Sequence, residues 1–161
     1  VYSFGKMFHA TGWKTGYCMA PEKIMSEIRK VHQFSVFAVN TPVQHALAEF
    51  IQKENEYMTL SSFYQDRRDY FNNLIMSMGF EIIPTSGTYF QVVNFKEFTE
   101  EADFDLAMRL VKDFGIAAIP MSSFYHNEEN TGTLRFCFAK SNEVLENAAE
   151  KLKNFYSVAI N

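Results

Sequence analysis

A serine and two lysines lie close together near the start of the chain. Ser3 precedes Lys6 by three residues, and Lys14 follows Lys6 by eight. Glycines interspersed through this stretch interrupt any regular helix or strand and let the backbone approach a ligand closely. A hydroxyl and a compact ammonium group suit a phosphate, and a crowded lysine has the lowered pKa that a Schiff-base nucleophile requires. The pattern predicts a functional loop that combines an amine nucleophile with an anion site.

A lone arginine interrupts an apolar segment near the other end of the chain. Arg135 lies between Leu134 and Phe136, in residues 133–140, where large apolar side chains alternate with other residues as in a strand with two different faces. A guanidinium group is expensive to bury without an anionic partner, and its planar shape pairs bidentately with a carboxylate. Arg135 is therefore a candidate for binding the α-carboxylate of an amino acid. A structural salt bridge, or a cation on an edge strand, is the alternative.

The serine and lysine pattern also carries a family resemblance. Ser3 and Lys6, followed by Thr-Gly-Trp-Lys at 11–14, resemble the lysine loop of fold-type I, pyridoxal-phosphate-dependent aminotransferases of class I/II, in particular the methionine and kynurenine/glutamine aminotransferase branch. The resemblance implies that Lys6 binds pyridoxal 5'-phosphate as a Schiff base, and that Ser3 and Lys14 hold the cofactor phosphate. Many relatives have arginine where this chain has Lys14. Without the matches later in the chain, a lysine on a surface loop would be the alternative, because short motifs match by chance.

Two aromatic residues match family positions near the substrate. Phe37 lies in the link at 33–40, which in the resembled branch reaches across a dimer, and matches an aromatic residue of the substrate side-chain pocket. Tyr89 lies in Gly-Thr-Tyr-Phe at 87–90, similar to a family segment near the active site. From the residues alone, a core phenylalanine and a hairpin turn that feeds a core strand stay open.

Two further matches lie in the last third of the chain. Phe124 ends the run Pro-Met-Ser-Ser-Phe at 120–124, similar to a Pro-x-Ser-x-Phe loop beside the family's substrate. Arg135 falls on the arginine of the family's Arg-x-x-Phe strand, which binds the substrate carboxylate. The resemblance thus adds Phe37, Tyr89, Phe124 and Arg135 as substrate-binding residues.

These residues must be positioned by helices and short strands, which the apolar spacing predicts. The order of the predicted elements, helices first and then strands that alternate with helices, favours an α/β fold of the two-layer sandwich type. By resemblance, residues 40–161 are the small C-terminal domain, and residues 1–39 are the lysine loop and edge of the large PLP-binding domain. Helices are predicted over 21–37, 41–53, 56–78, 102–114 and 141–156, and strands over 17–20, 80–83, 88–94, 116–119 and 133–140.

Composition narrows the classes of protein. The 161 residues suffice for one domain with a real core, and 47% of them are hydrophobic. A net charge of −4 without a basic stripe gives no indication of nucleic-acid binding, and no apolar run reaches the ~20 residues of a membrane span. Cys18 and Cys137 are predicted to be reduced, buried thiols of a cytoplasmic protein, with a disulfide between them as the alternative. No metal site is predicted, because His126 has no second ligand at metal spacing.

The resemblance also implies what the chain does. In the family the catalytic lysine lies well past the middle of the chain, so we expect a C-terminal fragment, inactive alone and part of a homodimer when complete. The expected reaction transfers the amino group of an apolar, aromatic or sulfur amino acid, such as methionine, to a 2-oxo acid, with Lys6 as general acid and base. A carbon–sulfur β-lyase on the same scaffold, and the ligand-sensing domain of a transcription regulator, are the alternatives.

Overall fold

The computed structural model describes residues 1–159, which fall into two compact units. The units are Val1–Leu60 and Ser61–Asn161. The domain boundary predicted between residues 39 and 40 stays a prediction, because compactness does not decide which residues belong to one domain of a longer protein.

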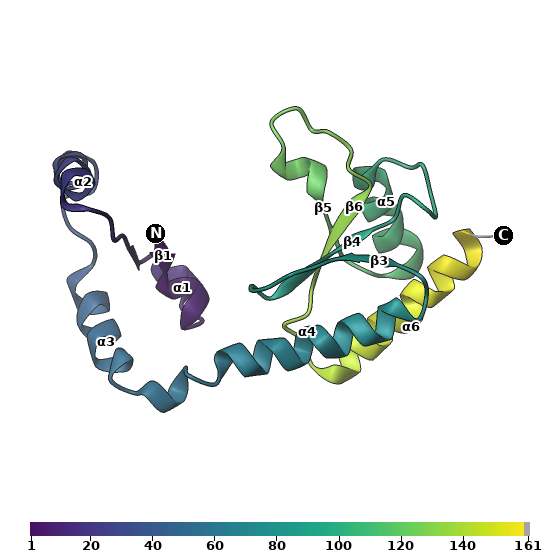
Figure 1. Ribbon diagram of the computed structural model, residues 1–161, viewed down its shortest axis with the longest axis horizontal. Helices are drawn as coiled ribbons and strands as arrows, with labels where there is room; N and C mark the ends of the chain where they lie inside the picture. Colours follow the sequence, from purple (N-terminus) through teal and green to yellow (C-terminus); the bar gives the residue numbers. More distant parts are fainter. Residues whose placement is uncertain (160–161) are drawn as a thin grey trace. The chain divides into compact units, whose positions relative to one another are not determined.

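The first unit consists of a folded loop followed by helices (Figure 1). Strands β1 and β2 pair in antiparallel fashion and enclose a short helix and a 3-10 turn. Two longer helices and a second 3-10 turn follow. In order, the elements are β1 (Tyr2–Ser3), α1 (Phe4–Met7), η1 (Thr11–Trp13), β2 (Gly16–Tyr17), α2 (Glu22–Ser35), α3 (Thr41–Ile51) and η2 (Glu54–Glu56).

Local signals set the ends of the two longer helices. Helix α2 begins directly after Pro21, and α3 begins after Asn40, whose Oδ1 accepts a hydrogen bond from the backbone N of Val43 at 3.3 Å. Both predicted helices are confirmed with slightly shorter ends. The helix predicted from residue 56 begins only at residue 60, because the chain first makes a 3-10 turn, which the Tyr57 hydroxyl closes by donating to the carbonyl of Ile51 at 2.8 Å.

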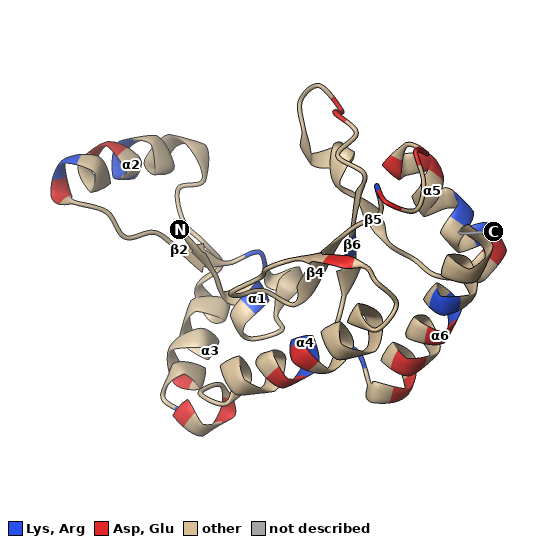
Figure 2. Ribbon diagram, turned by 45° about the vertical axis from the view of Figure 1, so that its right-hand side comes forward, with Lys and Arg blue, Asp and Glu red and all other residues tan. Residues whose placement is uncertain are grey.

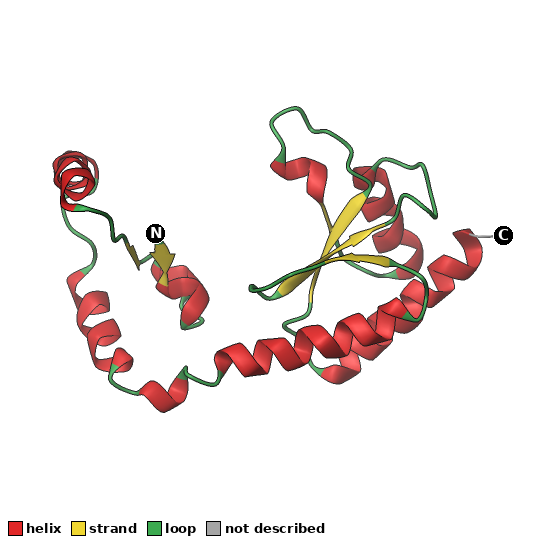
Figure 3. Cartoon of the chain, in the orientation of Figure 1, coloured by secondary structure: helices red, strands yellow, loops and turns green. Residues whose placement is uncertain are grey.

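The second unit is built around a four-stranded antiparallel sheet (Figure 3). The strand order is β3-β4-β6-β5, so β4 and β5 are consecutive in sequence but not neighbours in the sheet, and a helical segment connects them. Its elements are α4 (Leu60–Met76), β3 (Glu81–Ile83), β4 (Phe90–Asn94), α5 (Asp103–Arg109) with the π turn η3 (Leu110–Phe114), β5 (Ile119–Pro120), η4 (Met121–Phe124), β6 (Thr133–Cys137) and α6 (Asn142–Ala159).

The helices and one face of the sheet share a single apolar core, so the predicted two-layer α/β fold is confirmed. Leu134 and Phe136 alternate along β6 and point to the same side as Val93 of β4. Burial of these side chains removes apolar area from water and is the main favourable term in folding. Packed with them are Phe71, Ile75, Phe80, Phe95, Leu106, Ala107, Leu110, Ile116, Phe138, Leu145, Leu152 and Phe155.

The opposite face of the sheet carries none of this core, and we call it the open face. The strand register places Ile83, Val92, Arg135 and Ile119 in one row across all four strands on this face. Ile83 and Ile119 are more than two-fifths exposed, at 43% and 42%. In Figure 2 the charged residues of this unit lie mostly on its helices, and within residues 61–159 Arg135 is the one cation in the strands.

Polar contacts join the two long helices of the second unit. The hydroxyl of Tyr70 on α4 donates a hydrogen bond to Oε1 of Glu146 on α6, and Arg67 donates to Oδ1 of Asn142. Ionised Tyr70 would lose the bond that it donates and would face a negative charge. The hydrogen bond to Glu146 therefore raises the pKa of Tyr70 above its ordinary value of 10.0.

Three sequence predictions are wrong in detail. The strand predicted over 17–20 is β2, Gly16–Tyr17, because only these two residues face partners on β1. The buried strand predicted over 116–119 is a pair of residues, Ile119 and Pro120, because only these face partners on β6. The thiols were predicted to be buried, but Cys18 is only half-buried and Cys137 is exposed, since its place on β6 alternates with core positions. Both cysteines are free, so no disulfide joins them.

Candidate functional site

The first candidate site is the lysine loop, residues 2–17 of the first unit. Strands β1 and β2 pair so that Ser3 lies opposite Gly16, two residues after Lys14. Lys6 is the third residue of α1, and Lys14 follows η1 in the left-handed conformation, with φ of 51°. The side chains of Ser3, Lys6 and Lys14 are exposed. The fold thus returns Lys14 to the β1–β2 ladder, next to the strand that carries Ser3 into the lysine helix.

Hydrogen bonds inside the lysine loop fix its shape. The backbone N of Phe4 donates to the carbonyl of Thr15 at 3.2 Å. Thr11 Oγ1 donates to the carbonyl of Gly5 at 3.1 Å, and Thr15 Oγ1 donates to the carbonyl of Trp13 at 3.1 Å. These bonds tie the two helical turns of the loop to each other and to the ladder. The amine and the anion-binding groups are therefore held on one ordered segment.

The backbone at Gly16 leaves no room for a side chain. A Cβ atom at this position would lie 2.3 Å from the carbonyl oxygen of Tyr2. Such a contact is far inside van der Waals distance, so the ladder can close only with glycine here.

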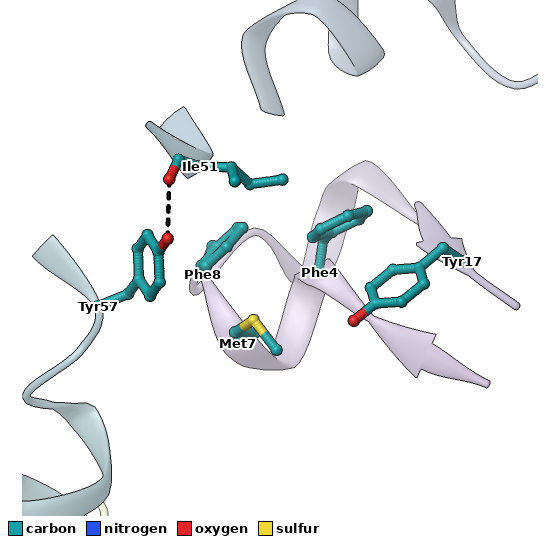
Figure 4. A pocket seen from close by; sticks show the side chains of 6 residues that line it. All are labelled: Phe4, Met7, Phe8, Tyr17, Ile51 and Tyr57. Carbon is teal, nitrogen blue, oxygen red and sulfur yellow. Dashed lines mark hydrogen bonds between the residues drawn. The ribbon is translucent and has the colours of Figure 1, made fainter. Parts of the chain in front are cut away.

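A cavity of about 360 Å³ lies beside the lysine loop, within the first unit (Figure 4). Side chains of α1 and β2 line it together with Ile51 and Tyr57, and the Tyr57 hydroxyl already donates to the carbonyl of Ile51. The side chains that line it carry no charge, and a carboxylate buried without a cationic partner is costly. The cavity is therefore not a candidate for the substrate carboxylate site. Its α1 and β2 residues are Phe4, Met7, Phe8 and Tyr17.

The second candidate site is the arginine cluster on the open face of the second unit, which comprises Phe90, Phe124 and Arg135. The Cζ atom of Arg135 lies 4.5 Å from the ring centroid of Phe90 and 5.0 Å from that of Phe124. Stacked rings favour the cation and leave the N–H edges of the guanidinium plane for an oxygen acceptor. No ion pair among residues 1–159 includes Arg135, so the structural salt-bridge alternative has no support.

Tyr89 ends the turn between the paired strands β3 and β4, and its ring is partly buried against the apolar core, as the hairpin alternative predicts. Its ring makes an edge contact with Phe90 at 5.8 Å between centroids, and its carbonyl accepts a hydrogen bond from the backbone N of Phe138 at 3.0 Å. The preceding residue, Thr88, has φ of 75°, a conformation that β-branched residues rarely adopt. Backbone strain of this kind persists where the surrounding structure imposes it and is common at functional sites.

Phe37 belongs to the first unit and lies in the link between α2 and α3. Its side chain is 80% exposed, and its backbone has φ of 66°. The backbone N of Phe37 donates to the carbonyl of His32 at 2.8 Å, which fixes this turn at the end of α2. The core position that the sequence left open is therefore not observed, and the ring is presented to solvent.

The sequence does not single out Phe90 of the arginine cluster, nor Asp103, which is hydrogen-bonded to the neighbouring turn η4. Phe90 was part of a matched run but was not singled out, although it lies on the same strand face as Val92, the cross-strand partner of Arg135. Asp103 falls within the helix predicted over 102–114 and carries no sequence signal of its own, but it is 1% exposed and accepts hydrogen bonds from Ser122. Neither contact can be derived without the strand register and the loop position.

Among residues 1–159, no group of three or more histidine, cysteine, aspartate or glutamate side chains could hold a metal ion. In the same part of the chain, no helix is both long and apolar enough to cross a bilayer.

The sequence and fold together define the class of protein. Residues 1–152 match the family aminotransferase class I and II, so the chain belongs to this family. The family predicted from the lysine loop and the arginine strand is thereby confirmed. Enzymes of this family are generally dependent on pyridoxal phosphate.

Individual relatives are similar over most of the chain. Methionine aminotransferase of Escherichia coli (strain K12) is 44% identical over 154 residues, which are 95% of this chain and 40% of that protein. Kynurenine–oxoglutarate transaminase 1 of Homo sapiens is 33% identical over 96% of this chain and 42% of that protein. The crystal structure of YbdL from E. coli, identified as having a methionine aminotransferase function, matches with a TM-score of 0.85 at 43% identity, over 94% of this chain and 40% of that chain. The chain thus spans about two-fifths of the length of these relatives.

Proposed function

We propose that this chain is the C-terminal part of a pyridoxal-phosphate-dependent transaminase, which moves the amino group of an apolar, aromatic or sulfur amino acid to a 2-oxo acid. The observation that carries the proposal is the ordered lysine loop in a chain that belongs to the aminotransferase family over residues 1–152. The complete enzyme acts as a homodimer in the cytoplasm. Residues 1–39 belong to its large domain and residues 40–161 to its small domain.

The donor set of the lysine loop fits pyridoxal phosphate. Ser3 offers a hydroxyl donor and Lys14 a compact cation for the phosphate; Ser3 lies in β1, and Lys14 lies two residues before its ladder partner Gly16. Lys6 lies between them in sequence, on a helix held to the ladder by hydrogen bonds, and supplies an amine for the aldehyde carbon. When bound, the cofactor supplies an electron sink for carbanion chemistry. The Lys6 amine then removes the proton from the substrate α-carbon and later returns one, as general base and general acid.

Arg135 binds the substrate carboxylate in this proposal. A guanidinium group presents two parallel N–H donors to a carboxylate, and hydrogen bonds between charged groups are stronger than neutral ones. Stacking on Phe90 and Phe124 holds the Arg135 plane in one orientation. An oriented plane selects a carboxylate over a neutral group of similar size.

Aromatic residues set the preference for the substrate side chain. Phe37 is held in a left-handed turn with an exposed ring, Phe124 lies over Arg135, and Tyr89 makes an edge contact with Phe90. Such rings favour a large apolar, sulfur-containing or aromatic side chain. The similar enzymes named for methionine and kynurenine support this substrate class.

Cofactor trapping tests the proposal directly. The complete protein is mixed with pyridoxal phosphate, reduced with borohydride, and digested to locate the modified lysine by mass analysis. We expect one adduct on Lys6, lost in Lys6→Ala and kept in Lys23→Ala, an exposed lysine at the start of α2. Scattered labelling, or an adduct that persists in Lys6→Ala, would contradict the proposed role.

Turnover assays separate the reaction types. Lys6→Ala should lower turnover by roughly 10²–10⁴-fold or more, the usual contribution of a positioned general base.

Incubation of the complete protein with methionine and a 2-oxo acid should yield a new amino acid. Release of ammonia with pyruvate from a cysteine conjugate, without a new amino acid, would favour the β-lyase.

A further inference from the structure

Asp103 is a buried carboxylate that holds the loop beside the arginine cluster. Its side chain accepts a hydrogen bond from the backbone N of Ser122 at 2.8 Å and another from Ser122 Oγ at 2.6 Å. Asp103 is 1% exposed, and no ion pair among residues 1–159 includes it. A carboxylate buried without a cation depends on the hydrogen bonds that it accepts. Ser122 therefore has a fixed place relative to the start of α5.

The turn that Asp103 holds is η4, and η4 supplies one ring of the arginine cluster. Phe124 is the last residue of η4, two positions after Ser122, and lies over Arg135 at 5.0 Å although it is 56% exposed. An exposed ring has few packing contacts to fix its position. On one side η4 continues from β5, where Pro120 pairs with Leu134 of β6. The pair of hydrogen bonds to Asp103 restrains it from the side of α5.

A second contact ties the returning loop to the same residue. Asn130 Oδ1 accepts hydrogen bonds from the backbone N of Asp103 at 3.2 Å and from the backbone N of Gly132 at 2.9 Å. Both η4 and the segment that leads into β6 are therefore anchored at the first residue of α5. The strand position of Arg135 follows three residues after Gly132.

We propose that Asp103 is a positioning residue for the substrate carboxylate. Its bonds to Ser122 set η4 so that the Phe124 ring covers the Arg135 guanidinium and fixes the direction of the N–H donors. This inference rests on the proposed function of Arg135 and extends it to a residue that does not touch the substrate. Without Asp103 the arginine remains, but its plane is no longer held.

The test compares binding of a carboxylate with binding of its amide in the complete, cofactor-loaded protein. The probes are 3-phenylpropionate and 3-phenylpropionamide, which share the apolar group and differ in charge. Asp103→Asn should weaken the carboxylate about tenfold, as expected when one charge-assisted hydrogen bond is lost, and should change the amide less than about twofold. The KM for the amino acid should rise while kcat stays within about twofold.

Matched variants make the result specific. Asp105→Asn, on the same turn of α5 but exposed, should leave both probes unchanged. If Asp103 acts through the aromatic ring, Asp103→Asn should add less than about twofold in a Phe124→Leu background. Ser122→Ala removes only the hydroxyl bond and should weaken the carboxylate in the same direction, which keeps the test decisive if Asp103→Asn folds poorly.

Two failures are distinguishable. If Arg135→Lys weakens 3-phenylpropionate but Asp103→Asn and Ser122→Ala do not, or if they weaken carboxylate and amide equally, the positioning role is overturned while the function of Arg135 stands. Full additivity of Asp103→Asn and Phe124→Leu would also overturn it. If Arg135→Lys leaves carboxylate binding unchanged, the proposed function of Arg135 fails instead.

Discussion

Replacing Gly16 by alanine should disable the lysine loop without touching any ligand-binding side chain. The added Cβ would lie 2.3 Å from the carbonyl oxygen of Tyr2 and 3.4 Å from its carbonyl carbon. Real Cβ contacts do not fall below 3.0 Å, so the two strands must separate by at least 0.7 Å, the difference between 3.0 and 2.3 Å. Because the neighbour is backbone, no rotation of a side chain relieves the clash. The shift displaces Ser3, which follows Tyr2 on β1.

The size of the effect follows from this overlap. Forcing extra atoms into a packed site usually costs about 1–3 kcal/mol. If the loop must keep its native shape to bind the cofactor, that cost lowers the affinity for pyridoxal phosphate by about 5- to 150-fold, at about 1.4 kcal/mol for each factor of ten. Gly12→Ala is the matched control, because a Cβ at Gly12 meets nothing within 4 Å. Its affinity should stay within about twofold.

The assay is a titration of the complete apoprotein with pyridoxal phosphate, followed by absorbance, beside a thermal melt of each variant. We expect weak binding and little borohydride-stable label for Gly16→Ala, and wild-type behaviour for Gly12→Ala. Wild-type affinity in both variants would refute the reasoning, since it assigns the whole loss to the contact with Tyr2. Equal losses in both would show that flexibility of the loop, rather than strand closure, controls cofactor binding.

Three further predictions concern the second unit. Arg135→Lys should raise the KM for the amino acid by about 10- to 100-fold with little change in stability, because it removes one charge-assisted bond and the planar stacking. Steady-state kinetics test this prediction, and Arg67→Lys on α4, where the arginine lies over the single ring of Phe63, is the control. Leu152→Ala, at 1% exposure, should destabilise the protein by about 2–5 kcal/mol, whereas Val158→Ala on the same helix, at 63% exposure, should be nearly neutral in chemical denaturation. The hydrogen bond to Glu146 that raises the pKa of Tyr70 stabilises the fold fully below pH 10.0, and this stabilisation is lost as the pH rises through the higher pKa of the folded state. The Tm of Tyr70→Phe should therefore fall less than that of the wild type above pH 10.0.

Local patterns in the sequence were enough to predict most helices. The amphipathic spacing, with Pro21 before α2 and Thr41 and Pro42 at the start of α3, indicated both helices, although the cap of α3 is Asn40, one residue earlier than Thr41. Strands were predicted less well, because a strand ends where its partner ends. The apolar run from Ile116 suggests a strand of four residues, but β6 offers partners only to Ile119 and Pro120. The first residue of that run is buried without strand pairing.

Site residues that are recognisable from local spacing can be predicted from the sequence, whereas those that depend on contacts with distant residues cannot. Lysine-loop residues lie within one short segment, so their spacing is itself the evidence for an amine beside an anion site. Asp103 and Asp105 both read as acidic residues in the first turn of a helix. Only the fold shows that one is buried against Ser122, nineteen positions later, while the other faces solvent. Residues that touch a ligand tend to be recognisable by type, whereas residues that hold them in place are defined by tertiary contacts, and for that reason Asp103 emerges from the structure alone.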